Sequence, residues 1–241
     1  MVLNIAHRGF SGLYPENTLL AFQKALELGV DAIELDVQLS KDGQVMVFHD
    51  EELVRTTGQP GLLMDYTAAE LQSMDASGRF GSLHGRNPIP TLAEYLELTQ
   101  GTGITTFLEL KNSMIPYPGL EQKTADVLAK FNRTGSVVMF SANHPSVKLF
   151  GRLAPQARLL FPLDNWIFYY GAYCHAHQID MCMPYFRALN PEVVAEIKAH
   201  QVKLIPWTVD DPADMRAMLD LGVDGMLTNR PDLLQDILSE K

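Results

Sequence analysis

The sequence contains little cysteine, few cations and no long apolar run. Its 241 residues include only Cys174 and Cys182, which lack the CxxC spacing of a metal site and are too few for a disulfide framework. The 19 Lys and Arg residues are outnumbered by 29 Asp and Glu residues, which argues against a broad nucleic-acid-binding surface. No segment reaches the ~20 apolar residues of a membrane helix, and the first residues do not resemble a signal peptide. We therefore expect a cytoplasmic protein with no membrane insertion and no nucleic-acid partner.

Short apolar runs alternate with stretches of helical periodicity along most of the sequence. Strands are predicted at residues 2–6, 32–39, 105–110, 136–140, 158–161, 179–183, 202–207 and 225–227. The helical stretches that follow are predicted at 17–28, 91–99, 120–131, 145–153, 166–177, 191–200, 212–221 and 231–238. This repetition, in a protein close to ~250 residues, predicts an α/β fold, a closed TIM (β/α)8 barrel. A doubly wound open sheet is the alternative, but no GxGxxG follows the first strand to support its dinucleotide-binding form.

One segment interrupts this alternation. After the second strand, Lys41-Asp42-Gly43 predicts a turn, and residues 44–48 then return as an antiparallel strand. Residues 51–90 are rich in Gly, Thr, Ser and Asp and hold only a short helical piece near 68–74. We expect a single domain over residues 1–241 with an inserted subdomain at about 51–90. The insertion is either a lid or collar for a substrate or a loop packed on the barrel rim.

Charged side chains gather where the predicted strands end. Glu34 and Asp36 lie two residues apart on one strand and therefore share a face. Glu109 and Lys111 repeat this geometry on another strand, and the carboxyl ends of barrel strands meet at one rim. Carboxylates in an apolar mouth repel unless a cation lies between them, and their oxygens are the ligands that Mg²⁺ or Ca²⁺ prefers. The alternative is a buried salt-bridge cluster with Lys111 and Arg8.

Histidines, cations and a tryptophan accompany the carboxylates. His7 and His49 each follow an apolar strand, where they are either structural or, because imidazole titrates near neutral pH, a general acid/base pair. Arg8 and Lys111 suit a phosphoryl group, the first as a fork and the second as a point charge. Trp207, at the end of the penultimate strand, is either a core residue or an apolar wall for a small polyol. This inventory predicts a metal-assisted reaction on a phosphate ester.

The order of these motifs matches a known family. HRG at 7–9 is followed by PENT at 15–18, ExD at 34–36 and HD at 49–50, and then by FLELK, PWTV and LGVDGMLTNRPD. In this order the sequence resembles the glycerophosphodiester phosphodiesterase family, in its compact cytoplasmic bacterial form. The resemblance implies a TIM barrel with a small insertion before the ELK strand. It also implies hydrolysis of glycerophosphodiesters to sn-glycerol 3-phosphate and an alcohol.

The resemblance further implies a role for each of these residues. The ligands of one divalent ion, Mg²⁺ or Ca²⁺, would be Glu34, Asp36 and Glu109. The acid/base pair would be His7 and His49. The groups that contact the phosphate and glycerol of the substrate would be Arg8, Lys111 and Trp207.

Two positions depart from the family pattern. Ser141-Ala142-Asn143 lacks an aromatic after the serine, and Asn229 stands where an aspartate is commoner. We expect neither to touch the chemistry, although both bear on the pocket wall and so on the leaving alcohol. A lysophospholipase D-type activity is the alternative function, and a non-catalytic binding protein is disfavoured because the full residue set is present. The head group, the metal, the individual histidine roles, attack by water or through a cyclic phosphate, and the oligomeric state stay open.

Overall fold

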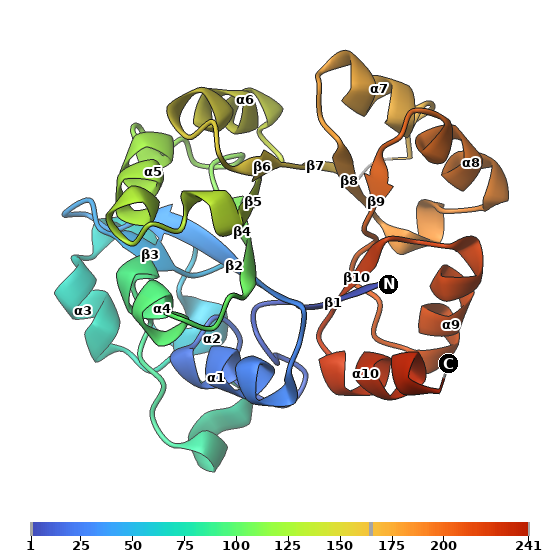
Figure 1. The fold of residues 1–241 in the computed structure, drawn as a ribbon. Coiled ribbons are helices and arrows are strands. Elements are labelled where there is room, and N and C mark those ends of the chain that lie inside the picture. Colours follow the sequence, from blue (N-terminus) through green and yellow to red (C-terminus); the bar gives the residue numbers. More distant parts are fainter. Residues whose placement is uncertain (1, 164–165, 241) are drawn as a thin grey trace.

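The strands form a ring enclosed by helices in the computed structural model, which describes residues 2–163 and 166–240 (Figure 1). The strands in this part of the protein are β1 (Leu3–Ala6), β2 (Ala32–Leu39), β3 (Val45–Val47), β4 (Thr105–Leu110), β5 (Val137–Phe140), β6 (Arg158–Leu159), β7 (Phe161–Leu163), β8 (Met181–Pro184), β9 (Lys203–Leu204) and β10 (Gly225–Thr228). The α-helices are α1 (Leu19–Leu28), α2 (Val54–Thr57), α3 (Ala68–Ser73), α4 (Leu92–Leu98), α5 (Leu120–Lys130), α6 (His144–Leu153), α7 (Tyr170–Ala176), α8 (Pro191–Ala199), α9 (Pro212–Leu221) and α10 (Pro231–Ser239). Short 3-10 turns are η1 (Leu63–Asp65), η2 (Gly78–His84), η3 (Thr134–Ser136) and η4 (Phe186–Ala188).

Parallel strands follow one another round the ring. One sheet has the order β10-β1-β2-β4-β5-β6, and a second has the order β7-β8-β9. At the first junction, β6 and β7 belong to one continuous segment of the chain. Leu160, which lies between them, donates its N–H to the carbonyl of Met139 in β5. At the other junction, the backbone N–H of Leu227 in β10 donates to Pro206, just beyond β9. The ring therefore continues through both junctions, and the predicted TIM-barrel fold is confirmed.

Side chains on β2 alternate between two environments. Leu35 points outward into an apolar cluster that also holds residues of α1, α4 and α5. Ala32 points inward and joins the cluster inside the barrel, where it meets Phe107 of β4. Glu34 and Asp36 share the side of Ala32 because side chains along a strand repeat every two residues. The strand thus carries two carboxylates into the barrel while its other face packs under the helices.

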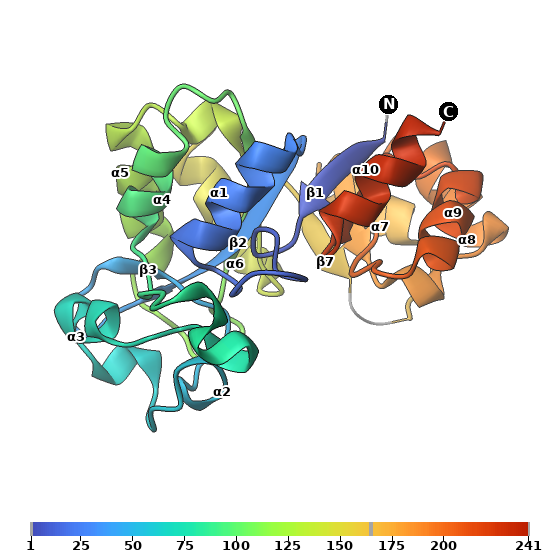
Figure 2. The ribbon, with the colours of Figure 1, turned by 90° about the horizontal axis from the view of Figure 1, so that it is seen from below.

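The insertion lies between β3 and α4. β3 runs antiparallel to β2, as the turn predicted, and α2 and α3 lie together at one end of the ring (Figure 2). The insertion has its own apolar cluster, which includes Leu53, Leu63 and Leu71. Arg79 Nη2 donates to the Ser11 carbonyl at 2.8 Å, in the loop that follows β1. This contact joins the insertion to the carboxyl end of the barrel, where the strands deliver their polar residues.

Three predicted elements differ from the structure. The helix predicted at 166–177 begins only at Tyr170, because Tyr169 has the left-handed φ of 64°. The strand predicted at 202–207 is regular only over Lys203–Leu204, and Pro206 lacks an N–H for a ladder. The strand predicted at 158–161 divides at Leu160, where its neighbour changes from β5 to β8. The other predicted elements are confirmed with ends within two residues.

Membrane-spanning helices were not expected from the sequence. Among the helices that the structure describes, none is both long enough and apolar enough to cross a membrane.

Candidate active site

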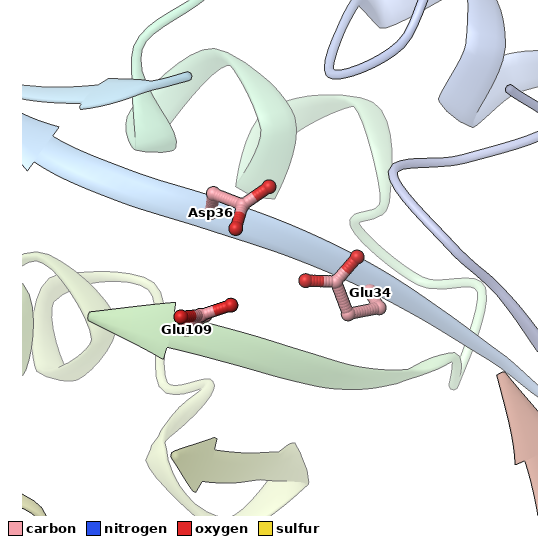
Figure 3. A group of neighbouring side chains, drawn as sticks. All are labelled: Glu34, Asp36 and Glu109. Carbon is pink, nitrogen blue, oxygen red and sulfur yellow. The ribbon is translucent and has the colours of Figure 1, made fainter. Parts of the chain in front are cut away.

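Three carboxylates from two neighbouring strands meet inside the barrel. Glu34 and Asp36 come from β2 and Glu109 from β4, and Asp36 is paired in register with Glu109. One oxygen from each carboxylate lies within 4.8 Å of the others. Figure 3 shows the three side chains pointing toward one another. The structure therefore brings together the three predicted metal ligands.

The buried carboxylates of this cluster are difficult to ionise together without a nearby cation. Burial, reinforced by the charge of Asp36, raises the pKa of Glu34 well above its usual value. Burial also raises the pKa of Glu109 to about 7. Burial opposes ionisation of Asp36 as well, but the electrostatic influence of the nearby basic groups His49, Arg8 and Lys111 holds its pKa below the usual range. Buried Asp36 Oδ1 has no hydrogen-bond partner among the described residues, so this oxygen and its two neighbours fit a hard divalent ion.

The turn after β1 explains the His-Arg-Gly motif. Arg8 has a φ of 54° and Gly9 a φ of 77°. A Cβ on Gly9 would lie 2.7 Å from the carbonyl carbon of Ala21, so only glycine fits there. The turn aims the backbone N–H of Arg8 at Glu34 Oε2, at 2.9 Å, and lets Arg8 Nη1 donate to Glu16 Oε1 at 2.8 Å. Arg8 is thus fixed beside the carboxylates by both its backbone and its side chain.

Lys111 follows β4 and Arg8 follows β1, so the two residues approach the cluster from the two parallel neighbours of β2. Lys111 Nζ donates to Glu109 Oε1 at 3.0 Å and lies 4.0 Å from Asp36 Oδ1. Arg8 Nε lies 3.4 Å from Asp36 Oδ2, so the two predicted phosphate cations flank the same carboxylate. This placement leaves positive charge at the edge of the cluster, where an anionic ligand would need it.

A series of hydrogen bonds fixes the tautomer of His7. His7 Nδ1 lies 2.7 Å from Asn229 Oδ1, and Asn229 Nδ2 donates to Asp210 Oδ2 at 2.7 Å. Because a carboxylate only accepts, the amide of Asn229 must turn its NH₂ to Asp210 and its oxygen to His7. The proton of neutral His7 is therefore on Nδ1, and Nε2, 3.9 Å from Glu34 Oε2, presents its lone pair to the cluster. Burial lowers the pKa of His7 to about 4, which keeps the ring neutral.

The contact with Asn229 corrects one expectation from the sequence. We expected Asn229 to lie clear of the chemistry, and this was wrong because it touches a candidate catalytic histidine. The strand register explains the contact: Ala6 of β1 is paired with Thr228 of β10, so the residues that follow each strand become neighbours. Adjacency of the first and last strands, which a closed barrel requires, was the signal that could have found it.

His49 is held by a second set of contacts. Its Nδ1 lies 2.6 Å from Asp50 Oδ1, and its Nε2 lies 3.3 Å from Lys111 Nζ. Gln38 Nε2 donates to the carbonyls of residues 48, 49 and 50 at 2.9, 3.1 and 2.8 Å. The buried amide of Gln38 thereby fixes the backbone that carries His49, and the histidine contacts Lys111 beside the carboxylate cluster.

The sequence assigned no role in the site to Glu16 and Asn17 of the PENT motif or to Asp50 of the HD motif. Asn17 Nδ2 donates to Asp36 Oδ2 at 2.8 Å and so orients a predicted metal ligand. Glu16 accepts from Arg8 and also from both terminal nitrogens of Arg55, at 2.8 and 2.7 Å. Arg55 in turn donates to Asp50, the partner of His49. These supporting contacts join side chains from three separate segments of the chain. The spacing of residues within one motif therefore does not reveal them.

Trp207 lies just beyond β9. Its ring centroid is 6.1 Å from that of Tyr185, and it packs against the apolar cluster inside the barrel. Its indole Nε1 is buried and has no hydrogen-bond partner within the described part of the protein. Part of the ring is therefore core, as one of the two sequence alternatives expected, and the role of Trp207 as a wall for a small polyol stays a prediction.

A cavity of about 450 Å³ opens beside the candidate site. Its barrel side includes His7, Arg8 and Asn229, and its opposite side is formed by the insertion, including Arg55 and Arg79. The volume falls within the ~300–1,000 Å³ typical of small-molecule sites. A ligand that reaches the carboxylate cluster can therefore extend between the barrel and the insertion.

Comparison with known proteins identifies the family of this protein. The model of the glycerophosphoryl diester phosphodiesterase family matches residues 7–233. The protein belongs to this family. The match spans the barrel from the His-Arg-Gly turn to α10, so the family assignment covers the carboxylate cluster and the insertion together.

Individual relatives agree with this assignment. A glycerophosphodiester phosphodiesterase of Bacillus altitudinis is 42% identical over 247 residues, which cover 98% of the present sequence and 97% of that protein. One from Caldanaerobacter subterraneus subsp. tengcongensis is 38% identical, with 98% and 97% coverage. An Oleispira antarctica phosphodiesterase, solved in complex with the product sn-glycerol-3-phosphate, has a TM-score of 0.87 and 28% identity, and the match covers 98% of the present sequence and 96% of the Oleispira one. The predicted family and enzyme class are confirmed.

Proposed function

We propose that this enzyme hydrolyses glycerophosphodiesters to sn-glycerol 3-phosphate and a free alcohol in a metal-dependent reaction. The observation that carries the proposal is the convergence of three carboxylates, two histidines and two cations at one end of the barrel. The similar Oleispira antarctica structure, which holds sn-glycerol-3-phosphate, supports the same product here.

One divalent ion, Mg²⁺ or Ca²⁺, is proposed to bind Glu34, Asp36 and Glu109. Their buried oxygens supply hard ligands. Burial, reinforced by the charge of Asp36, raises the pKa of Glu34 and Glu109, and a cation would offset this cost of ionisation. When bound, such an ion polarises a phosphoryl oxygen and offsets the charge that develops on it. Arg8 and Lys111, which flank Asp36, are placed to contact the remaining phosphate oxygens.

His7 and His49 are proposed to move the two protons of the reaction. The nucleophile is water or a hydroxyl of the substrate's glycerol. It adds to phosphorus as the P–O bond to the head group breaks. One histidine accepts the proton of the nucleophile, and the other donates a proton to the leaving oxygen. Both rings have Nδ1 held by a side-chain oxygen, while Nε2 of His7 faces Glu34 and Nε2 of His49 faces Lys111, so both rings lie beside the cluster.

The remaining assignments concern the whole protein. We propose that residues 1–241 act as one catalytic domain, with residues 51–90 as an inserted subdomain that closes the head-group side. Trp207 is proposed as the glycerol-side wall, where its free indole N–H can donate to a hydroxyl. The cytoplasmic location stays a prediction.

A lysophospholipase D-type activity is the second candidate. The observation that favours it is a set of exposed apolar side chains on segments that follow strand carboxyl ends or belong to the insertion. They are Leu83, Met114, Trp166 and Phe168, which are 73%, 78%, 73% and 89% exposed. Amphipathic and aromatic side chains of this kind suit contact with a lipid surface, from which a lysophospholipid could be drawn.

The test compares two substrates that share one head group. The full-length protein is incubated with glycerophosphoglycerol or with lysophosphatidylglycerol, with Mg²⁺, with Ca²⁺ or with EDTA, and the phosphomonoester products are quantified. We expect sn-glycerol 3-phosphate from the first substrate, its loss with EDTA and its recovery with excess metal. Faster formation of lysophosphatidic acid from the second would favour the alternative. No phosphomonoester product with either metal would refute both functions.

Histidine variants test the chemistry within this assay. His7→Ala and His49→Ala should each lower kcat by ~10²–10⁴-fold, because each removes a proton-transfer group. His175→Ala, at an exposed histidine on α7, is the matched control and should keep the wild-type rate. A His7 or His49 variant with near-wild-type kcat would remove that residue from the mechanism.

A further inference from the structure

The cavity between the barrel and the insertion has an uneven distribution of charge. Its lining includes the cations Arg8, Arg55 and Arg79 and a single carboxylate, Glu16. Arg8 and Arg55 both donate to Glu16, and Arg55 also pairs with Asp50. The first two cations are therefore largely compensated by their partners.

Arg79 differs from these two arginines. Within the described residues, no carboxylate lies within 4.0 Å of its guanidinium, so its charge is uncompensated. Its Nη2 donates to the carbonyls of Ser11 and Gly12 at 2.8 and 3.3 Å, and its Cζ lies 4.9 Å from the ring centroid of Phe80. These contacts hold the guanidinium at the cavity wall, while Nε and Nη1 make no hydrogen bond within the same part of the protein.

The position of the cavity relates it to the leaving alcohol. It shares His7 and Arg8 with the candidate site, but its lining includes none of Lys111, Glu109 or Trp207. The part of the substrate that extends into it therefore lies on the insertion side, away from the proposed glycerol wall. A fixed guanidinium with two free donor nitrogens, Nε and Nη1, favours a phosphate at that position, since its fork matches phosphate oxygens.

We propose that this cavity receives the leaving alcohol, and that Arg79 makes the enzyme prefer head groups that carry a further phosphate. The inference rests on the proposed function and adds a substrate class to it. The reaction itself is unchanged: water adds across the P–O bond to the head group, whose oxygen takes up a proton. With a head group of glycerol bearing a second phosphodiester, the products are sn-glycerol 3-phosphate and glycerophosphoglycerol.

The experiment uses two substrates that differ by that further phosphate. Deacylated cardiolipin carries it, glycerophosphoglycerol does not, and initial rates give the ratio of their kcat/KM values. Deacylated cardiolipin has two equivalent bonds that can be cleaved, which alone would make its kcat/KM about twice that of glycerophosphoglycerol. In the wild type, the ratio of the two kcat/KM values should exceed this factor of about two. Arg79→Gln should lower the ratio about fivefold, the size expected for one partly exposed charge, and added salt should lower it in the wild type. Arg79→Lys should retain part of the preference because it keeps the charge and loses the fork.

A charge reversal and a matched control complete the test. Arg79→Glu should lower the ratio further and raise kcat/KM for the cationic glycerophosphocholine relative to glycerophosphoglycerol. Arg86→Gln is the control, because Arg86 is an exposed arginine of the same subdomain that donates to a carbonyl, Gln72 O at 2.8 Å, without lining the cavity. For Arg86→Gln, the ratio of kcat/KM for deacylated cardiolipin to that for glycerophosphoglycerol should equal the wild-type ratio.

The outcomes separate the two proposals. If Arg79→Gln lowers both rates equally and leaves the ratio unchanged, Arg79 only supports the loop after β1 and the inference is wrong. A wild-type ratio at or below the statistical factor would also overturn it. If the wild type cleaves neither substrate, the proposed function fails instead.

Discussion

The substitution Asp210→Asn tests whether the tautomer of His7 is set from a distance. Asp210 accepts hydrogen bonds from the backbone N–H and the Nδ2 of Asn229, each at 2.7 Å, and from Thr228 Oγ1 at 3.1 Å. An asparagine at 210 replaces one accepting oxygen with an NH₂, which would face the NH₂ of Asn229. Turning the Asn229 amide relieves this conflict, but then its NH₂ faces His7 Nδ1.

The turned amide would change the chemistry of His7 in either of its roles. As a base, His7 must carry its proton on Nδ1 to leave Nε2 free, and as an acid it must carry protons on both nitrogens. An NH₂ group opposite Nδ1 disfavours both states. A hydrogen bond to a charged group contributes about 1.5–3 kcal/mol, which corresponds to a fall in kcat/KM of about 10- to 150-fold.

The assay is kcat/KM for glycerophosphoglycerol, together with ¹⁵N NMR of the His7 ring to report its tautomer. Asp211→Asn is the matched control, because Asp211 caps α9 through the N–H of Ala213 at 2.8 Å and asparagine caps a helix as well as aspartate does. The double substitution Asp210→Asn/Asn229→Asp should recover activity, since a carboxylate at 229 accepts from both neighbours. A single variant within twofold of wild type, with an unchanged tautomer, would refute the reasoning.

Three further predictions concern the metal, the ion pairs and the insertion. Glu109→Gln should raise the Mg²⁺ concentration for half-maximal activity by at least about tenfold, and an unchanged titration would remove Glu109 from the ligand set. Although burial opposes its ionisation, hydrogen bonds from Arg55 lower the pKa of Glu16 from 4.5 to about 2, so its ion pairs stabilise the fold above pH 4.5 and are lost as the pH falls toward 2. Glu16→Gln should therefore cost about 2 kcal/mol of unfolding free energy at pH 7 and almost nothing at pH 2, and a difference that does not shrink with pH would contradict this. Leu53→Ala, in the buried cluster of the insertion, should cost about 3 kcal/mol by thermal unfolding, against less than about 0.5 kcal/mol for the exposed Val54→Ala, and equal effects would show that the cluster adds no stability.

Local periodicity was enough to predict the barrel because each strand and helix carries its own pattern. The spacing of Glu34 and Asp36 also predicted their common inward face, which depends only on the two-residue repeat of a strand. Errors arose where a single residue overrides the pattern, as Tyr169 does by its positive φ before α7. The strand predicted at 202–207 was too long for a similar reason. Its apolar residues favour a strand, but Pro206 has no N–H to extend the hydrogen-bond ladder.

The contacts that orient the site were harder to predict because they join distant segments. His7 and Asn229 are 222 positions apart, and Arg55 and Glu16 are 39 apart. Such pairs follow from the closure of the ring and from the docking of the insertion, and no local pattern shows which residues these two contacts bring together. The motif order identified which residues matter, but the geometry alone shows what each one touches.

The ion pairs around Glu16 give the insertion a part in aligning the two histidines. Arg8, which follows His7, donates to Glu16, and Arg55 of the insertion donates both to Glu16 and to Asp50. Asp50 in turn holds Nδ1 of His49. A displacement of α2 would therefore act on both histidines through one continuous set of charges, because Arg55 is the one arginine among the described residues that contacts both Glu16 and Asp50. The insertion is thus coupled to the positions of both candidate catalytic histidines as well as to the cavity that it lines.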